Sequence, residues 1–294
     1  MPASANAGGD RSLTRALGLK LRRIMIDPGH GGFDDGSTGP GGLKEKDLAL
    51  DLALRVGALV REKLKVDVFY TRDTDEFVVL ERRAEIANEQ HADLFLSIHA
   101  NSSQAQSATG IETYYLSVSG TKAAMEVASR ENAASQKSMG DLSGLLQQIV
   151  LNDKVRESVE FAGKVQSALV ANTGSPGARS RNRGVRRAPF IVLIGAKMPA
   201  ILAEVGFLSN AQEEAGMRKP EYRDRMAQAL YAGIEAYALS LSQFQQQQAA
   251  SKPVAVRQMP PPAPPKQSVT ASAPQRRAGG KPSPTRRQRI GASN

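Results

Sequence analysis

The order of apolar and polar positions divides the chain into short apolar runs and longer amphipathic stretches. Six apolar runs are typical of buried strands: 23–27, 66–70, 93–99, 111–116, 190–193 and 200–204. Apolar residues recur at helical spacing in three other stretches: 46–63, 79–89 and 222–240. Strands that alternate with helices favour an α/β domain with a mostly parallel mixed sheet flanked by helices.

This alternation is interrupted over residues 117–178, where helical patterns follow one another without a strand between them. An Ala-rich stretch covers 121–138, and apolar stripes at helical spacing cover 142–150 and 155–169. We therefore expect a helical insertion over 117–178 within a domain that spans residues 21–241.

The charge is distributed unevenly along the chain. The formal net charge is +10, and residues 241–294 contain nine Lys or Arg residues and no Asp or Glu. We expect residues 242–294 to form a disordered, Pro-rich basic tail, and residues 1–20 to form a flexible lead. Such a tail can bind nucleic acid, anionic lipid or anionic wall polymer, or it can be a solvated tail without one partner. The rest of the chain has no nucleic-acid-reading module, so we expect no specific nucleic acid partner.

Two absences limit the possible chemistry and location. The chain contains no cysteine, so a metal ion must be held by His, Asp or Glu side chains. No apolar run is long enough to cross a membrane, and residues 1–20 contain no apolar core typical of a signal peptide. Either the protein stays inside the cell or this sequence lacks its export signal.

Two of the three histidines lie where predicted strands end. His30 follows the first strand within a glycine-rich loop, and His99 ends a buried strand. Each alone is typical of an ordinary loop or core histidine, but strand ends in an open α/β sheet converge on one crevice. His91 lies at the end of a predicted helix, where a surface or capping role is expected.

Two glutamates are candidates to complete a site with these histidines. Glu45 lies where the glycine-rich loop enters a helix, a position that also suits a carboxylate favoured by the helix dipole. Glu204 lies inside an apolar run and needs a cation, a donor or a raised pKa if it is buried. A salt bridge to Arg186 or Arg187 is the alternative. Two imidazoles and two carboxylates are the parts of a hydrolytic zinc site.

The residue sequences of several segments are more specific evidence of a family than the spacing of the candidate ligands. The chain resembles the zinc-dependent N-acetylmuramoyl-L-alanine amidases of the type 3 family, the cell-wall amidases used in daughter-cell separation. The resembling segments run in order from about residue 22 to residue 240: 26–32, 45–47, 71–73, 82–88, 97–101, 110–112 and 204–210. The resemblance therefore covers the whole predicted domain.

The resemblance implies a function and a set of roles. Zinc would be held by His30, Glu45 and His99, and Glu204 would take a proton from the attacking water and pass it to the leaving amine. The amide bond that is cut would join N-acetylmuramic acid to L-alanine of the peptidoglycan stem peptide. Asn101, beside His99, is a candidate substrate contact.

The insertion suggests regulation. In septal members of the family, a glutamate on an inserted helix occupies the open zinc position until an activator protein displaces the helix. Within 121–138, Glu131 shares a face with Ala124 and Val127, whereas Glu126 lies on a polar face. We therefore expect Glu131 to be the inhibitory metal ligand, with an ordinary exposed glutamate as the alternative.

The resemblance also implies a location and leaves other functions open. Its substrate lies outside the cytoplasmic membrane, so we expect a location in the periplasm or cell envelope. One alternative is a peptidoglycan-binding or regulatory protein that keeps the fold without turnover. Another is a zinc amidase or peptidase that acts on a different substrate, since metal ligands determine the chemistry and not the acyl group.

Overall fold

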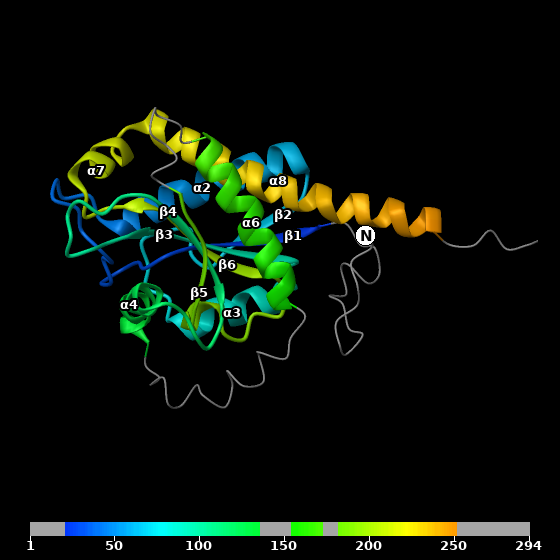
Figure 1. Cartoon of the computed structure of the whole chain (residues 1–294), viewed down its shortest axis with the longest axis horizontal. Coiled ribbons are helices and arrows are strands. Elements are labelled where there is room, and N and C mark those ends of the chain that lie inside the picture. The colour runs from blue at the N-terminus through cyan, green and yellow to red at the C-terminus, as the bar shows by residue number, and fades with distance from the viewer. Residues whose placement is uncertain (1–20, 136–153, 173–181, 252–294) are drawn as a thin grey trace, which may run out of the picture. The chain divides into compact units, whose positions relative to one another are not determined.

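The sheet is the frame that positions the candidate residues (Figure 1). A computed structural model describes residues 21–135, 154–172 and 182–251, all within one compact unit, Met1–Lys252. The sheet has six strands: β1 (Arg23–Pro28), β2 (Asp67–Tyr70), β3 (Leu94–Asn101), β4 (Ile111–Leu116), β5 (Asn182–Ala188) and β6 (Ala200–Phe207).

The strand order is β2-β1-β3-β6-β4-β5. The strands β2, β1, β3 and β6 pair in parallel, whereas β4 runs antiparallel to β6 and parallel to β5. The predicted α/β fold with a mostly parallel mixed sheet is therefore confirmed. The two central parallel strands, β3 and β6, carry His99 and Glu204 opposite each other in register.

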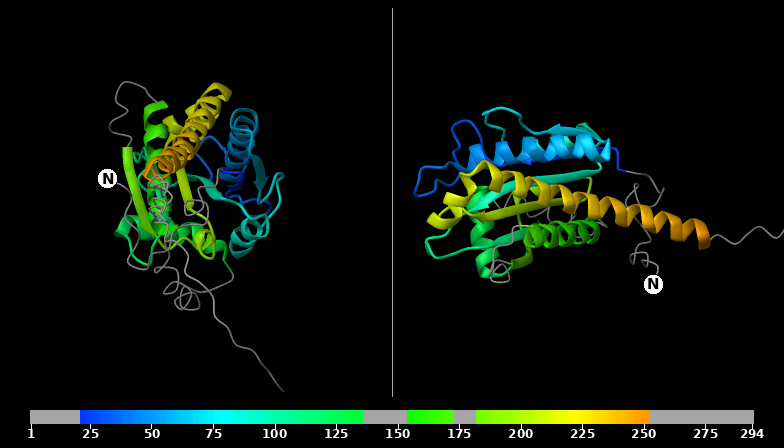
Figure 2. Two further views of the ribbon diagram at one scale, coloured as in Figure 1. Left: turned by 90° about the vertical axis from the view of Figure 1, so that its right-hand side faces the viewer. Right: turned by 90° about the horizontal axis from the view of Figure 1, so that it is seen from above.

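Helices cover both faces of this sheet (Figure 2). The helical elements are α2 (Glu45–Leu64), α3 (Leu80–Glu89), α4 (Lys122–Glu131), η1 (Asn132–Ala134), α6 (Lys154–Asn172), η3 (Ile191–Leu193), α7 (Ala211–Met217) and α8 (Pro220–Ser251). Helices α2, α6 and α8 pack on one face, and α3, α4 and η3 pack on the other. Side chains of successive β1 residues pack on opposite faces of the sheet. Ile24 and Ile26 pack with α2, α6 and α8, and Met25 packs with α3, α4 and η3.

The prediction of a strand over residues 190–193 is wrong. Residues Ile191–Leu193 form a 3-10 turn, and the strand lies earlier, at Asn182–Ala188. This edge strand is rich in arginine and half-exposed, so it lacks the apolar run that identifies a buried strand. The apolar residues after it pack between the sheet and α3 instead.

The segment expected to be an insertion divides into two different parts. Helix α4 covers the face of the sheet that carries His99, whereas α6 packs against α8 and β4 in the main core. Helix α6 is therefore a covering helix of the fold. The apolar stripe predicted over 142–150 lies outside the described residues.

The structure describes part of the two regions that were expected to flank the domain. Helix α8 continues to Ser251, past the expected start of the tail at residue 242. The predicted lead, 1–20, and the remainder of the predicted tail, 252–294, lie outside the described residues. Among the helices that the structure describes, none combines the length and apolar character of a membrane span.

Candidate metal centre

Four side chains from four separate elements converge at the carboxyl ends of β1 and β3. His30 lies in the loop after β1, Glu45 begins α2, His99 lies in β3 and Glu131 ends α4. One ligand atom from each side chain lies within 4.8 Å of the others. Parallel strands end at the same edge of a sheet, which explains why a loop residue and a strand residue meet here.

Each carboxylate of this group contacts both imidazoles. Oε1 of Glu45 lies 3.2 Å from Nε2 of His30 and 3.0 Å from Nδ1 of His99. Oε2 of Glu131 lies 3.1 Å and 3.0 Å from the same two nitrogens. His30 Nε2 and Glu131 Oε2 are buried and have no hydrogen-bond partner outside this group. Two imidazole nitrogens and two carboxylate oxygens form a donor set that suits zinc.

A second layer of contacts orients these ligands. Oδ2 of Asp34 lies 2.9 Å from Nδ1 of His30, which leaves Nε2 facing the group. His30 has a φ of 59°, a left-handed backbone conformation that is uncommon for a residue other than glycine. Oε2 of Glu45 accepts a hydrogen bond from the Ser37 N–H at 2.9 Å. Sequence analysis did not identify Asp34, and its spacing four residues after His30 is the one signal that suggests it.

Two glycines give the ligands their space. A Cβ atom at Gly29 would lie 2.4 Å from the His99 ring. A Cβ atom at Gly36 would lie 2.6 Å from the His30 ring and 2.8 Å from Oε2 of Glu45. Larger side chains at these positions would displace the ligands from one another.

The substitution Gly29→Ala is therefore expected to lower zinc affinity by roughly 10- to 100-fold, because the new methyl group displaces the His99 ring. Competition with a chromogenic chelator measures this affinity. Gly163→Ala in α6 is the matched control, since a Cβ atom there meets nothing within 4 Å. Equal zinc affinity in both variants would show that the ring position does not depend on this glycine.

A buried polar network beneath the site was not predicted. The Asp27 carboxylate, at the end of β1, accepts hydrogen bonds from Thr71 Oγ1 (2.5 Å), Ser97 Oγ (2.6 Å) and Arg83 Nη1 (2.8 Å). Arg83 also donates to the carbonyl oxygens of Pro28 (2.7 Å) and His30 (2.8 Å). The arginine therefore ties the ligand loop to the strand from which it emerges.

Arg72 is a second buried arginine in this network. It donates to the carbonyl oxygens of Gly29 (2.7 Å) and Lys46 (3.0 Å), and so links the ligand loop to the first turn of α2. Both arginines lie in segments that carried the family resemblance, 71–73 and 82–88, but the sequence did not reveal their role. Their role is to satisfy backbone carbonyls that the irregular loop leaves unpaired.

Glu204 lies beside the four-residue group, on the neighbouring strand β6. It pairs with His99 in register and is fully buried, and neither of its carboxylate oxygens has a hydrogen-bond partner. Burial, together with the negative charge of Glu131, raises the pKa of Glu204 well above its usual range. The alternative salt bridge with Arg186 is not formed, because Arg186 pairs with Glu112 instead.

The four-residue group concentrates negative charge. Burial alone would lower the pKa of His99, but the carboxylates of Glu131 and Glu45 outweigh it and raise that pKa to about 10. Burial opposes the charge on Glu45, but the two imidazoles hold its pKa well below its usual range. Positive charge is needed to balance these carboxylates, either as protons on the imidazoles or as a metal ion.

Helix α4 is held in place next to the site. Its buried face consists of Ala124, Val127, Ala128 and Glu131. At its end, the Asn132 side chain donates to the Pro189 carbonyl oxygen (2.8 Å) and accepts from the Ile191 N–H (2.9 Å). Ser135 Oγ donates to Oε1 of Glu81 on α3 at 2.6 Å. These bonds hold the end of the helix that carries Glu131.

Asn101 contacts this helix. Its Oδ1 accepts hydrogen bonds from Arg130 Nη2 (2.7 Å) and from the Ser102 N–H (2.8 Å), while its buried Nδ2 has no partner. The side chain is therefore close to the site but engaged by α4. His91 is exposed in the turn after α3 and does not belong to the group.

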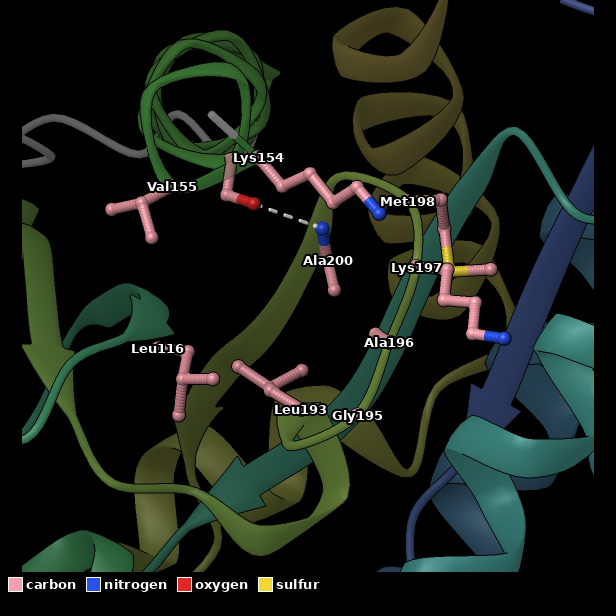
Figure 3. Close-up of a pocket in the computed structure, with 10 residues that line it drawn as sticks. Leu116, Lys154, Val155, Leu193, Gly195, Ala196, Lys197, Met198 and Ala200 are labelled. Atoms are coloured by element: carbon pink, nitrogen blue, oxygen red, sulfur yellow. Dashed lines mark hydrogen bonds between the residues drawn. The ribbon is translucent and has the colours of Figure 1, made fainter. Parts of the chain in front are cut away.

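Two hollows lie in different parts of the domain. One of about 770 Å³ runs between α4 and the loop after β3, and its lining includes Arg130, Glu126 and Ser103. A smaller one of about 110 Å³, shown in Figure 3, lies beside the first residues of α6 and β6. Lys154, Leu193 and Met198 are among the residues that line it, and it contains no metal-binding group.

The chain is similar to a known group of enzymes. The sequence profile of the family described as N-acetylmuramoyl-L-alanine amidase matches residues 24–236. The amidase AmiA of Salmonella typhimurium is 33% identical over 239 residues, which cover 78% of this chain and 80% of AmiA. The amidase LytC of Bacillus subtilis is 34% identical over 73% of this chain and 35% of LytC.

Solved structures agree with these sequence matches. The N-acetylmuramoyl-L-alanine amidase of Clostridium difficile 630 superposes with a TM-score of 0.58 at 30% identity, covering 75% of this chain and 98% of that one. The amidase AmiC2 of Nostoc punctiforme gives a TM-score of 0.55 at 32% identity, with 74% and 97% covered.

Proposed function

The chain belongs to the N-acetylmuramoyl-L-alanine amidase family, and on that premise we propose that His30, Glu45 and His99 hold a catalytic zinc ion that Glu131 blocks at rest. The enzyme hydrolyses the amide bond between N-acetylmuramic acid and L-alanine in peptidoglycan. The observation that carries the proposal is the convergence of four ligand atoms within 4.8 Å, two of them buried and without a hydrogen-bond partner outside the group.

The reaction needs a polarised carbonyl and an activated water. When bound, zinc supplies this Lewis-acid chemistry. The ligand residues contribute rigidity, since Asp34 and the Ser37 N–H fix the imidazole of His30 and the carboxylate of Glu45. The two buried arginines hold the backbone of the ligand loop, so the site keeps its geometry during turnover.

Glu204 moves the proton in this proposal. Its carboxylate takes a proton from the attacking water and delivers it to the nitrogen of the leaving L-alanine. Its position opposite His99 supports this role, because the carboxylate faces the ligand group across one strand pair. Its raised pKa also suits a group that must hold a proton between two steps.

Glu131 acts as an internal inhibitor in this proposal. Its Oε2 contacts both ligand imidazoles and takes the position that a substrate carbonyl or a water needs. The Asn132 and Arg130 contacts hold α4 over the site, so release of Glu131 requires movement of the helix. An activator protein that docks on α4 would supply that movement.

The setting of this reaction follows from the family. Because the substrate of the family is peptidoglycan, we propose the periplasm as the location and wall remodelling at cell division as the process. Contact of residues 242–294 with anionic envelope components stays a prediction.

Substitution of Glu131 by alanine in the full chain is expected to raise basal hydrolysis by roughly tenfold or more, because it removes the carboxylate that competes for the metal position. Release of stem peptides from purified sacculi, analysed by mass spectrometry with and without chelator, measures this rate. A point substitution is preferable to deletion of residues 117–178, since α6 belongs to the core.

Glu126→Ala is the matched control, a carboxylate on the same helix away from the ligand group. No rise in the Glu131 variant would remove the inhibitory role. An activator should raise the wild-type rate toward that of the Glu131 variant and leave the variant itself unchanged. If neither protein shows chelator-sensitive cleavage with zinc bound, a wall-binding protein without turnover becomes the better reading.

A further inference from the structure

Two arginines of the edge strand β5 bind one buried carboxylate. Nε of Arg186 lies 3.0 Å from Oε2 of Glu112, and Nε of Arg183 donates to Oε1 of the same side chain. Glu112 also accepts a hydrogen bond from the Tyr114 hydroxyl at 2.5 Å. Two guanidinium groups on one carboxylate leave an excess of one positive charge.

A β-bulge brings the two arginines together. Along the β4–β5 pair, Ile111 lies opposite Asn182, but the next residue, Glu112, lies opposite Gly184. Arg183 is therefore the extra residue of a bulge, and Gly184 adopts a φ of 84°. In a regular strand, residues 183 and 186 would point to opposite faces, because side chains alternate. The bulge redirects both arginines toward Glu112.

The pair adjoins the candidate catalytic residues. Glu112 lies opposite Glu204 in the β4–β6 pairing, and Glu204 lies opposite His99 in the β3–β6 pairing. These three side chains therefore form a row across one face of the sheet, and the two arginines of β5 extend that row. Glu112 and Glu204 are therefore direct cross-strand neighbours on this face.

The guanidinium groups are oriented but not enclosed. Arg183 lies 4.9 Å over the Phe207 ring, and its Nη1 is 3.4 Å from the Thr109 carbonyl oxygen. The side chains of Arg183 and Arg186 are 32% and 26% exposed, whereas Glu112 is 2% exposed. The Nε atom of each arginine is therefore engaged by Glu112, while part of each side chain remains exposed to solvent.

We propose that Arg183 and Arg186 form an anion subsite that binds the free stem-peptide carboxylate nearest to the cleaved bond. This rests on the proposed amidase function. A planar guanidinium matches a carboxylate with paired N–H donors, and a group fixed beforehand loses less entropy on binding. Glu112 and Phe207 provide that fixation. The subsite would hold the peptide side of the substrate, while Glu204 acts at the amide.

The test uses two soluble N-acetylmuramoyl tripeptides in which the second residue is joined to the third through its side chain. The α-carboxyl group of that second residue is free in one tripeptide and amidated in the other. Hydrolysis is measured with the zinc-loaded full chain in the Glu131→Ala background. We expect a preference for the free carboxylate. Arg186→Gln should lower kcat/KM for that substrate by roughly tenfold, mainly through KM, with little effect on the amidated substrate.

Two further variants separate recognition from folding. Arg187→Gln is the matched control, because Arg187 is exposed on the same strand and makes no contact with Glu112 in the described structure. Arg186→Lys should keep part of the preference, since it retains the charge but loses the paired donors. Thermal unfolding of each variant shows whether the domain stays intact.

Measurements of substrate affinity test the anion subsite independently of turnover. Calorimetry with Glu131→Ala/Glu204→Gln chains, with and without Arg186→Gln, compares Kd for the two tripeptides. A loss of affinity equal for both tripeptides, or no preference in the parent chain, overturns the subsite. If the chain binds the free-carboxylate tripeptide more tightly, but the Glu131→Ala chain that keeps Glu204 hydrolyses neither tripeptide, the proposed function is overturned and the subsite is retained.

Discussion

Replacement of Glu204 by glutamine is expected to reduce hydrolysis by roughly a thousandfold while zinc content stays unchanged. Glutamine keeps the size of the side chain but cannot take a proton from water. Glu204 is not among the four side chains that share the metal group, so removal of its charge should leave the ligands in place. Stem-peptide release and metal analysis on the same preparation measure the two effects.

The comparison needs the active background and a matched surface variant. Both variants are made with Glu131→Ala, so that the proposed inhibitory contact does not mask the loss. Glu62→Gln, an exposed position of α2, should keep the parent rate. Activity within a few-fold of the parent in the Glu204→Gln chain would assign the proton transfer to another group.

Replacement of His99 by alanine is expected to lower zinc affinity by about 100-fold or more and to abolish detectable hydrolysis. The imidazole is 3% exposed, and its Nδ1 lies 3.0 Å from both carboxylate ligands, so no other side chain can take its place. Zinc stoichiometry and competition with a chelator measure the binding.

His91 provides the control for this variant. It is exposed in the turn after α3, so His91→Ala should bind zinc as tightly as the parent chain. The two substitutions remove the same chemical group from opposite environments. If His99→Ala keeps parent-like zinc affinity, the metal lies elsewhere and the proposed ligand set must be abandoned.

Most of the fold was predictable because its strands are buried on both faces. Apolar runs of this kind predicted β1, β3, β4 and β6 to within three residues at each end. Strand β5 was missed because it is an edge strand with arginines at 183, 186 and 187. The separate roles of α4 and α6 were also hidden, since both have helical patterns and only packing shows which one belongs to the core.

The candidate ligands were predictable for a different reason. His30 and His99 lie at strand ends, where side chains of a parallel sheet converge, and the segments around them resemble one enzyme family. The supporting residues Asp27, Arg72 and Arg83 were not predicted. Their role depends on carbonyl groups of an irregular loop, and the sequence alone does not show which carbonyls lack a partner.

The order of strands in the sheet has a consequence for folding. Strand β6 is adjacent to β3, although β4, α4, α6 and β5 all lie between them in the chain. Pairings between such distant segments form slowly, because a long loop must close first. His99 and Glu204 meet only through this pairing, so a chain that has not formed it lacks the proposed catalytic carboxylate beside the candidate ligands. The pairing that brings these two side chains together therefore cannot form until β6 has been synthesised.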